Sequence, residues 1–250
     1  MIKLKDILLE VIGTPKAIFL GGPAGSGKSY ILKHIIPASL EVLNVDTTYE
    51  QLLQASGLGM DIKDFDQAKL SQAAKLMAQA KKVTDTRYND LSIQKKDIVI
   101  DATGAASKPL LLKKVQLGEL GYETMMVMIW VSPYTSLERN VSRVRSLPMH
   151  IVLKTWEGVN KNIDEYKREF GDKFILINND AGGKLEYDDV YAKSKFITGK
   201  GSGKVRTPEE LVKLRADRDI LVKSINDLIR IPREFTSIDD AKSKINNFLN

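Results

Sequence analysis

The chain has 250 residues, of which 43% are hydrophobic and 28% charged, and its formal net charge is +6. A chain of this length buries about 70–75% of its unfolded surface on folding, so it can form a core without cross-links. The absence of cysteine excludes a disulfide scaffold, a thiolate metal site and a cysteine nucleophile. The two histidines are too few for a histidine-cluster metal site. The net positive charge is a mild indication of an anionic partner.

No segment is typical of a membrane protein or a secreted one. The longest uncharged apolar run, residues 124–131, is too short to span a bilayer. Asp6 and Glu10 interrupt the apolar N-terminal stretch, which is not typical of a signal peptide. We therefore expect a soluble protein of the cytoplasm, or of the host cytoplasm if a phage encodes it.

Short apolar runs alternate with longer helical patterns between residues 16 and 179. The runs predict five strands, at residues 17–20, 41–45, 97–100, 124–131 and 174–177. The runs are continuous rather than alternating with polar residues, as expected when helices cover both faces of a sheet. The sequence therefore predicts a three-layer α/β fold with a five-stranded, mainly parallel sheet.

The segments between the predicted strands carry helical patterns. We expect helices over residues 66–90, from a cap at Ser107 to residue 118 or 121, from Pro133 through Arg143, and over residues 152–170.

The composition changes after residue 180. Residues 191–206 contain five basic and no acidic residues, which fits either a phosphate-attracting arm or a flexible linker. Capping boxes at residues 207–210 and 237–240 predict one helix to about residue 229 and another at the C-terminus. The expected division is a core over residues 1–180 with a lid near 139–150, a basic linker over 181–206, and a helical C-terminal extension over 207–250.

The strongest motif is a full G-x-x-x-x-G-K-[ST] match between a predicted strand and a predicted helix. Its residues are Gly22, Pro23, Ala24, Gly25, Ser26, Gly27, Lys28 and Ser29. Glycines allow backbone N–H groups to surround a phosphate, the lysine can bridge the β- and γ-phosphates, and the serine hydroxyl can bind Mg²⁺. We expect ATP and Mg²⁺ at this loop. A similar string at residues 199–204 lacks the first glycine and the Ser/Thr, and is interpreted as linker.

Two aspartates follow predicted strands, at the sheet edge where ligands of parallel sheets bind. Asp46 can accept the proton of an attacking hydroxyl, or it can cap the following helix. Asp101 can hold Mg²⁺ beside the loop, or it can be part of a strand-end turn. Thr103 and Gly104, just beyond Asp101, are candidate substrate contacts.

Two arginines lie one helical turn apart between the fourth and fifth predicted strands. Arg139 and Arg143 can bind the triphosphate from a lid and neutralise the charge that develops during transfer, or they can form a solvated basic face.

The motifs GGPAGSGKS, VDTT, DIVIDATG, GYETMMVMIWVSP and LERNVSR, in this order, resemble the phage-type polynucleotide kinase and zeta-toxin group of P-loop kinases over about residues 16–180. The resemblance implies an ATP- and Mg²⁺-dependent kinase that acts on a hydroxyl group. It also implies that Asp46 is the catalytic base and Arg143 the lid arginine on the phosphates. Arg139 matches the residue that leads into the lid helix.

One position departs from the pattern of this group. An arginine that helps to hold the acceptor typically follows the base by three residues, and Tyr49 occupies that position here. The acceptor is a polynucleotide 5′-hydroxyl on the first interpretation, and a nucleotide-sugar or another small alcohol on the second. An ATP-dependent interaction module and a simple ATPase are the alternatives of another class. The tail carries no Asp-x-Asp phosphatase signature, so no phosphatase activity is expected.

Overall fold

A computed structural model describes residues 13–59, 65–142, 147, 149–180, 232 and 234–250. The predicted helix over 207–229, the linker over 181–206 and Arg143 lie outside these residues. In the part of the chain that is described, every helix is too short or too polar to cross a membrane.

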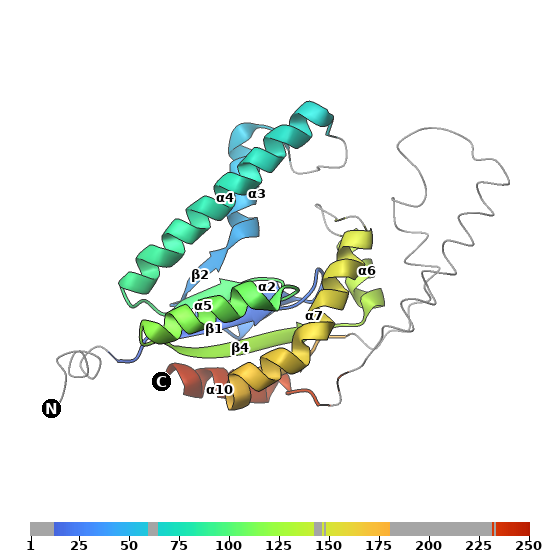
Figure 1. Ribbon diagram of the computed structural model, residues 1–250. Helices are drawn as coiled ribbons and strands as arrows, with labels where there is room; N and C mark the ends of the chain where they lie inside the picture. The colour runs from blue at the N-terminus through green and yellow to red at the C-terminus, as the bar shows by residue number, and fades with distance from the viewer. Residues whose placement is uncertain (1–12, 60–64, 143–146, 148, 181–231, 233) are drawn as a thin grey trace.

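The elements alternate between strands and helices along the chain (Figure 1). The strands are β1 (Lys16–Gly21), β2 (Glu41–Asn44), β3 (Ile98–Asp101), β4 (Glu123–Trp130) and β5 (Phe174–Asn178). The helices are α2 (Lys28–His34), α3 (Val45–Ser56), α4 (Gln67–Ile93), α5 (Ser107–Glu119), α6 (Pro133–Val141), α7 (Met149–Phe170) and α10 (Ile238–Leu249), with a 3₁₀ turn η2 (Gly171–Lys173) before β5.

All five strands run parallel in the order β2-β3-β1-β4-β5, which confirms the predicted fold class. Each predicted strand is present, and each of its two ends differs from the predicted end by at most one residue. The carboxyl ends of the strands therefore meet at one edge, where the loops after β1, β2 and β3 lie together.

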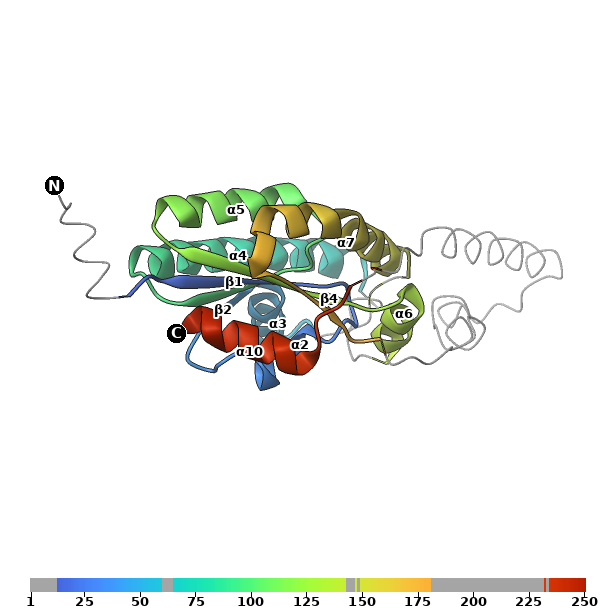
Figure 2. The ribbon, with the colours of Figure 1, turned by 90° about the horizontal axis from the view of Figure 1, so that it is seen from below.

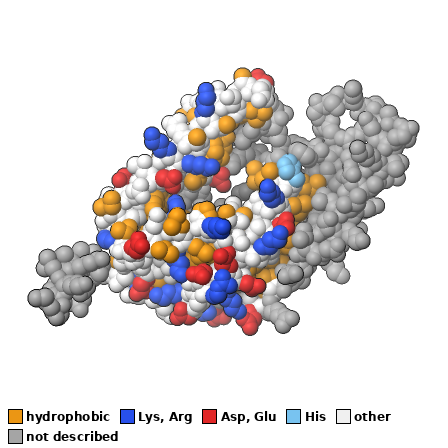
Figure 3. Space-filling view, viewed as in Figure 1, with side chains coloured by type: hydrophobic (Ala, Val, Ile, Leu, Met, Phe, Trp, Pro, Cys, Tyr) orange, Lys and Arg blue, Asp and Glu red, His pale blue; other side chains and the backbone are white. Residues whose placement is uncertain are grey.

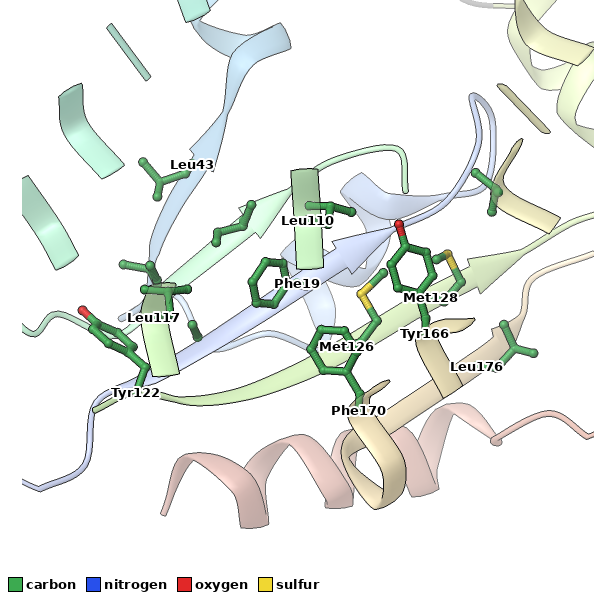
Figure 4. Close-up of a cluster of buried hydrophobic side chains, with 14 of the residues drawn as sticks. Phe19, Leu43, Leu110, Leu117, Tyr122, Met126, Met128, Tyr166, Phe170 and Leu176 are labelled. Atoms are coloured by element: carbon green, nitrogen blue, oxygen red, sulfur yellow. The ribbon is translucent and has the colours of Figure 1, made fainter. Parts of the chain in front are cut away.

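The sheet is the middle of three layers, with α5 and α7 on one face and α2 and α10 on the other (Figure 2). Successive side chains of β1 point to opposite faces of the sheet: Phe19 packs toward α5 and α7, while Ile18 packs toward α2 and α10. Figure 4 shows the first of these clusters, in which Phe19 lies against Phe170 with their ring centroids 5.6 Å apart. Burial on both faces explains why the strands read as unbroken apolar runs.

Helix α10 belongs to this core rather than to a separate appendage. Its residues Ala241 and Ile245 are fully buried in the same cluster as Ile18 of β1. The chain just before it is held to β5, because Thr236 N donates to Leu176 O at 2.7 Å. The predicted cap of this helix is confirmed: Ser237 Oγ accepts from Asp240 N at 3.1 Å. The described end of the expected C-terminal extension thus completes one layer of the fold.

Helices α3 and α4 form an arm that projects from the sheet (Figure 1). The arm has its own small cluster around Tyr49, Leu53, Ala73 and Ala80. Only the C-terminal part of α4, through Tyr88, joins the cluster that α5 and α7 cover.

Two predicted helix starts differ from the structure. Ser107 is the first residue of α5 rather than its cap, since Ala106 occupies the cap position without a side-chain hydrogen bond. Asn44 rather than Asp46 caps α3: its side chain accepts from Thr47 N at 3.1 Å.

The role of α10 in the core leads to a stability prediction. Ile245→Ala should lower the free energy of unfolding by about 2–5 kcal/mol, because it removes a fully buried side chain. Ile238→Ala on the same helix is the matched control, since Ile238 is 42% exposed and should change stability by about 0.5 kcal/mol at most. Urea denaturation measures both, and equal effects would contradict the packing of α10 described here.

Candidate active site

The loop between β1 and α2 has the backbone of a phosphate cradle. Gly25 and Gly27 adopt left-handed conformations, with φ of 75° and 93°, which residues with a Cβ rarely adopt. Among the described residues, the N–H groups of Gly25 and Gly27 make no hydrogen bond to a backbone oxygen. Successive N–H groups held in such a loop form an anion-binding concavity.

The outer side of this loop is held by side chains from distant parts of the chain. Three consecutive loop carbonyls each accept one hydrogen bond: Ala24 O from Ser136 Oγ at 2.6 Å, Gly25 O from an Arg139 nitrogen at 3.1 Å, and Ser26 O from Asn179 Nδ2 at 2.8 Å. The packing is close enough to require glycine. A Cβ on Gly25 would lie 2.9 Å from Ser136 O, and one on Gly27 would lie 2.3 Å from Asn179 Nδ2.

The start of the loop is joined to the segment after β3. Gly22 N donates to Thr103 O at 2.9 Å, so this N–H is engaged within the protein. Gly22 is therefore a structural member of the motif rather than a phosphate donor. Lys28 Nζ donates to Gly22 O at 2.7 Å, which folds the lysine side chain back over the loop.

The segment after β3 is fixed in turn by α7. Gly104 O accepts hydrogen bonds from the Tyr166 hydroxyl at 3.0 Å and from Asn162 Nδ2 at 3.2 Å. The Gly104 residue itself is buried, while Thr103 is exposed. Of these two predicted substrate contacts, only Thr103 is exposed at the surface.

Asp101 and Asn44 are register partners at the ends of β3 and β2. The Asn44 amide donates to Asp101 Oδ2, while Asp101 Oδ1 is buried and has no hydrogen-bond partner among the described residues. Burial raises the pKa of the Asp101 carboxyl; Lys28 and the Asn44 hydrogen bond oppose this, and Asp46 adds to it. Lys28, Asp46 and Asp101 follow or end three neighbouring parallel strands, β1, β2 and β3, so they lie at the same edge of the sheet.

Asp46 lies in the first turn of α3 and is exposed. Its predicted alternative role, as the helix cap, is wrong because Asn44 performs it. The carboxylate of Asp46 is therefore not committed to capping the helix.

The side chain of Tyr49 is buried inside the arm. Its side chain is only 3% exposed and packs in the arm cluster with Leu53. The expectation that Tyr49 contacts the acceptor is corrected by this burial.

Arg139 lies in α6 and is bound to the protein rather than extended from a lid. One guanidinium nitrogen donates to Gly25 O, and another donates to Asn179 O at 3.0 Å. The expectation that Arg139 binds the triphosphate from a lid is not supported by this geometry. Residues 149–150 of the expected lid belong to α7.

The site residues present fit ATP and Mg²⁺. The loop offers N–H groups and Lys28 to phosphates, and the buried hydroxyl of Ser26 has no hydrogen-bond partner among the described residues. The unpaired Asp101 Oδ1 is a hard oxygen of the kind that Mg²⁺ and its water shell prefer. Ser29, exposed in the first turn of α2, adds a hydroxyl.

Sequence reasoning missed three residues that build the site: Asn44, Ser136 and the side chain of Asn179. Asn44 and Asn179 each stand at or just after the end of a strand, which is a usable signal in a parallel sheet. Ser136 gives no such signal, because it lies inside a helix 112 residues from its partner.

Comparisons with known proteins agree with this fold. A family model described as an AAA domain matches residues 18–166. A crystal structure of an AvrRxo1-ORF1:AvrRxo1-ORF2 complex with sulfate ions superposes on this chain with a TM-score of 0.56 at 16% identity. The match covers 96% of this chain and 82% of that chain. For the same complex with ATP, the TM-score is 0.53 at 18% identity, covering 96% and 78%.

A structure from the PezAT chromosomal toxin–antitoxin system of Streptococcus pneumoniae has a TM-score of 0.48 at 15% identity, covering 86% of this chain and 88% of that chain. At these identities the AvrRxo1 comparisons show a shared fold alone, and no argument rests on the PezAT match. No curated protein matches the chain.

Lys28 supplies the point charge of the loop, so its removal should weaken triphosphate binding. Lys28→Ala should raise the dissociation constant of ATP at least about tenfold, since hydrogen bonds to a charged group contribute about 1.5–3 kcal/mol. Titration calorimetry measures the change. Lys33→Ala, an exposed lysine on the same helix, is the matched control. Equal ATP affinity of the two variants would contradict the phosphate site.

Proposed function

The chain belongs to the AAA domain family, whose model covers more than half of it, and within this family we propose that the protein is a kinase. The proposed reaction transfers the γ-phosphate of ATP to a hydroxyl group. The observation that carries the proposal is the placement of Lys28, Asp46 and Asp101 at the carboxyl edge of three neighbouring parallel strands, beside the phosphate loop. A carboxylate that is not a helix cap, placed near the phosphate lysine, is what transfer to an alcohol requires.

The phosphate loop binds ATP in this proposal. N–H groups of Gly25 and Gly27 contact phosphate oxygens, and Lys28 leaves Gly22 O to bridge the β- and γ-phosphates. A solved structure of similar fold carries ATP, which supports the choice of nucleotide. Arg143, outside the described residues, stays our candidate for the arginine that neutralises charge on the transferred phosphoryl group.

Ser29 and Asp101 are the residues that would hold Mg²⁺, through the serine hydroxyl and Oδ1 of the aspartate. The ion supplies charge neutralisation on the phosphate oxygens when it is bound. Asn44 occupies the other carboxylate oxygen of Asp101 and so leaves Oδ1 for this purpose.

Asp46 acts as the general base. Its carboxylate takes the proton of the acceptor hydroxyl as the acceptor oxygen bonds to the γ-phosphorus. The bond between that phosphorus and the β–γ bridging oxygen breaks, ADP leaves, and the proton passes from Asp46 to solvent. The products are ADP and a phosphomonoester of the acceptor.

The first candidate acceptor is a polynucleotide 5′-hydroxyl, from the resemblance of the motifs to phage-type polynucleotide kinases. The second candidate is a small alcohol, including a nucleotide-sugar, and two observations favour it. Helix α3, which carries the proposed base Asp46, also contains Glu50 and no lysine or arginine, and the side chain of Tyr49 is buried. Among the described residues on the face shown in Figure 3, acidic and basic side chains are interspersed rather than gathered in the basic stripe typical of nucleic-acid binding.

Asp46→Asn tests the proposed base. The variant should bind ATP and melt close to wild type, because Asn44 and not Asp46 caps α3. Phosphoryl transfer should slow by at least about 10²-fold, the usual cost of losing a general base. A radiolabelled transfer assay measures the rate. Asp66→Asn, at the cap of α4, is the matched control and should keep its rate. Normal transfer by Asp46→Asn would show that the base is wrong.

A further inference from the structure

We propose that Ser136, Arg139 and Asn179 are positioning residues that set the phosphate loop for nucleotide. They are placed on the outer side of the loop and act through its backbone rather than by touching the ligand. This inference rests on the nucleotide site proposed above and adds three residues to it. We refer to the three side chains as the outer bracket.

The outer bracket acts on consecutive peptide groups. Ser136 Oγ, an Arg139 nitrogen and Asn179 Nδ2 bind the carbonyls of Ala24, Gly25 and Ser26 respectively. In a trans peptide the C=O of one residue and the N–H of the next point in opposite directions. Holding the Ala24 and Ser26 carbonyls outward therefore turns the N–H groups of Gly25 and Gly27 to the inner side.

The intermediate peptide group is held by the loop itself as well as by Arg139. Ser26 N donates to Pro23 O at 3.1 Å, which closes a turn within the loop. The Gly25 and Gly27 N–H groups, which the outer bracket turns inward, donate to no backbone oxygen among the described residues.

Two members of the outer bracket are hydrogen-bonded to each other and to the sheet, and the third is buried. Arg139 donates a second hydrogen bond to Asn179 O, and Asn179 N donates to Trp130 O at 2.9 Å. Ser136 is completely buried in α6. The start of α6 is fixed to the same strand end, since Ser132 Oγ donates to Asp180 Oδ1 at 3.1 Å.

The physical reason for such a bracket is electrostatic. Glycine-rich segments visit many backbone conformations, and a flipped peptide would present its carbonyl oxygen to the phosphate. The partial negative charge of that oxygen would then repel the negatively charged phosphate. Side chains that are hydrogen-bonded to the carbonyls before the nucleotide binds prevent this flip. Less conformational entropy of the loop is therefore lost on binding.

Ser136→Ala and Asn179→Ala test the inference by nucleotide binding, without the need for a known acceptor. Each variant should raise the dissociation constant of Mg²⁺-ATP by about tenfold, measured by titration calorimetry well below the melting temperature. Affinity for adenosine, which has no phosphate, should stay unchanged. A loss of general stability would not produce this difference between the two ligands.

Ser142→Ala is the matched control, because the hydroxyl of this residue, at the C-terminal cap of α6, also donates to a backbone carbonyl but one outside the phosphate loop, Glu138 O at 3.2 Å. The control should bind ATP as the wild type does. Because Asn179 is only half-buried, its variant keeps the test decisive if Ser136→Ala fails to fold.

Two results would overturn the inference and are distinguishable from each other. If the wild type binds ATP and both folded bracket variants bind it equally well, the outer bracket has no positioning role and the proposed function stands. If the wild type binds no ATP, the proposed function fails and the inference fails with it.

Discussion

The hydrogen bonds to the outer carbonyls of the phosphate loop are the constraint on which the rest of the site depends. Strand β1 delivers the loop to the sheet edge, but the loop's shape is determined by α6 and by the chain after β5. Those elements stand where they do because β4 pairs with β1, and β5 pairs with β4, in the parallel sheet. The topology of the sheet thus sets the conformation of a glycine-rich loop.

The opposite side of the site depends on β2, β3 and α7. Helix α7 holds the chain at Gly104 through Tyr166, and that chain holds Gly22 through Thr103 O. Asn44 joins the ends of β2 and β3 and also caps α3, so one amide determines the placement of Asp101 and of the helix that carries Asp46. The proposed base and the proposed metal ligand are positioned by a shared residue.

Sequence reasoning reached the features whose cause is local. Continuous apolar runs identify strands covered on both faces, and the P-loop motif identifies the loop because every residue type in it has a local function. The remaining features depend on distant partners. Arg139 lies 114 residues from Gly25, and Asn44 lies 57 residues from Asp101, so neither pairing leaves a pattern in a single sequence. The burial of Tyr49 likewise depends on how α4 packs on α3.

The central claim is that the site transfers a phosphoryl group to an alcohol. The most direct measurement follows the label from [γ-³²P]ATP in the presence of 5′-hydroxyl DNA, 5′-hydroxyl RNA, nucleosides or nucleotide-sugars. The account predicts that one acceptor becomes covalently labelled, and that labelled product forms faster than inorganic phosphate. Label recovered only as inorganic phosphate, at the same rate with and without every acceptor, would contradict the kinase assignment and favour an ATPase.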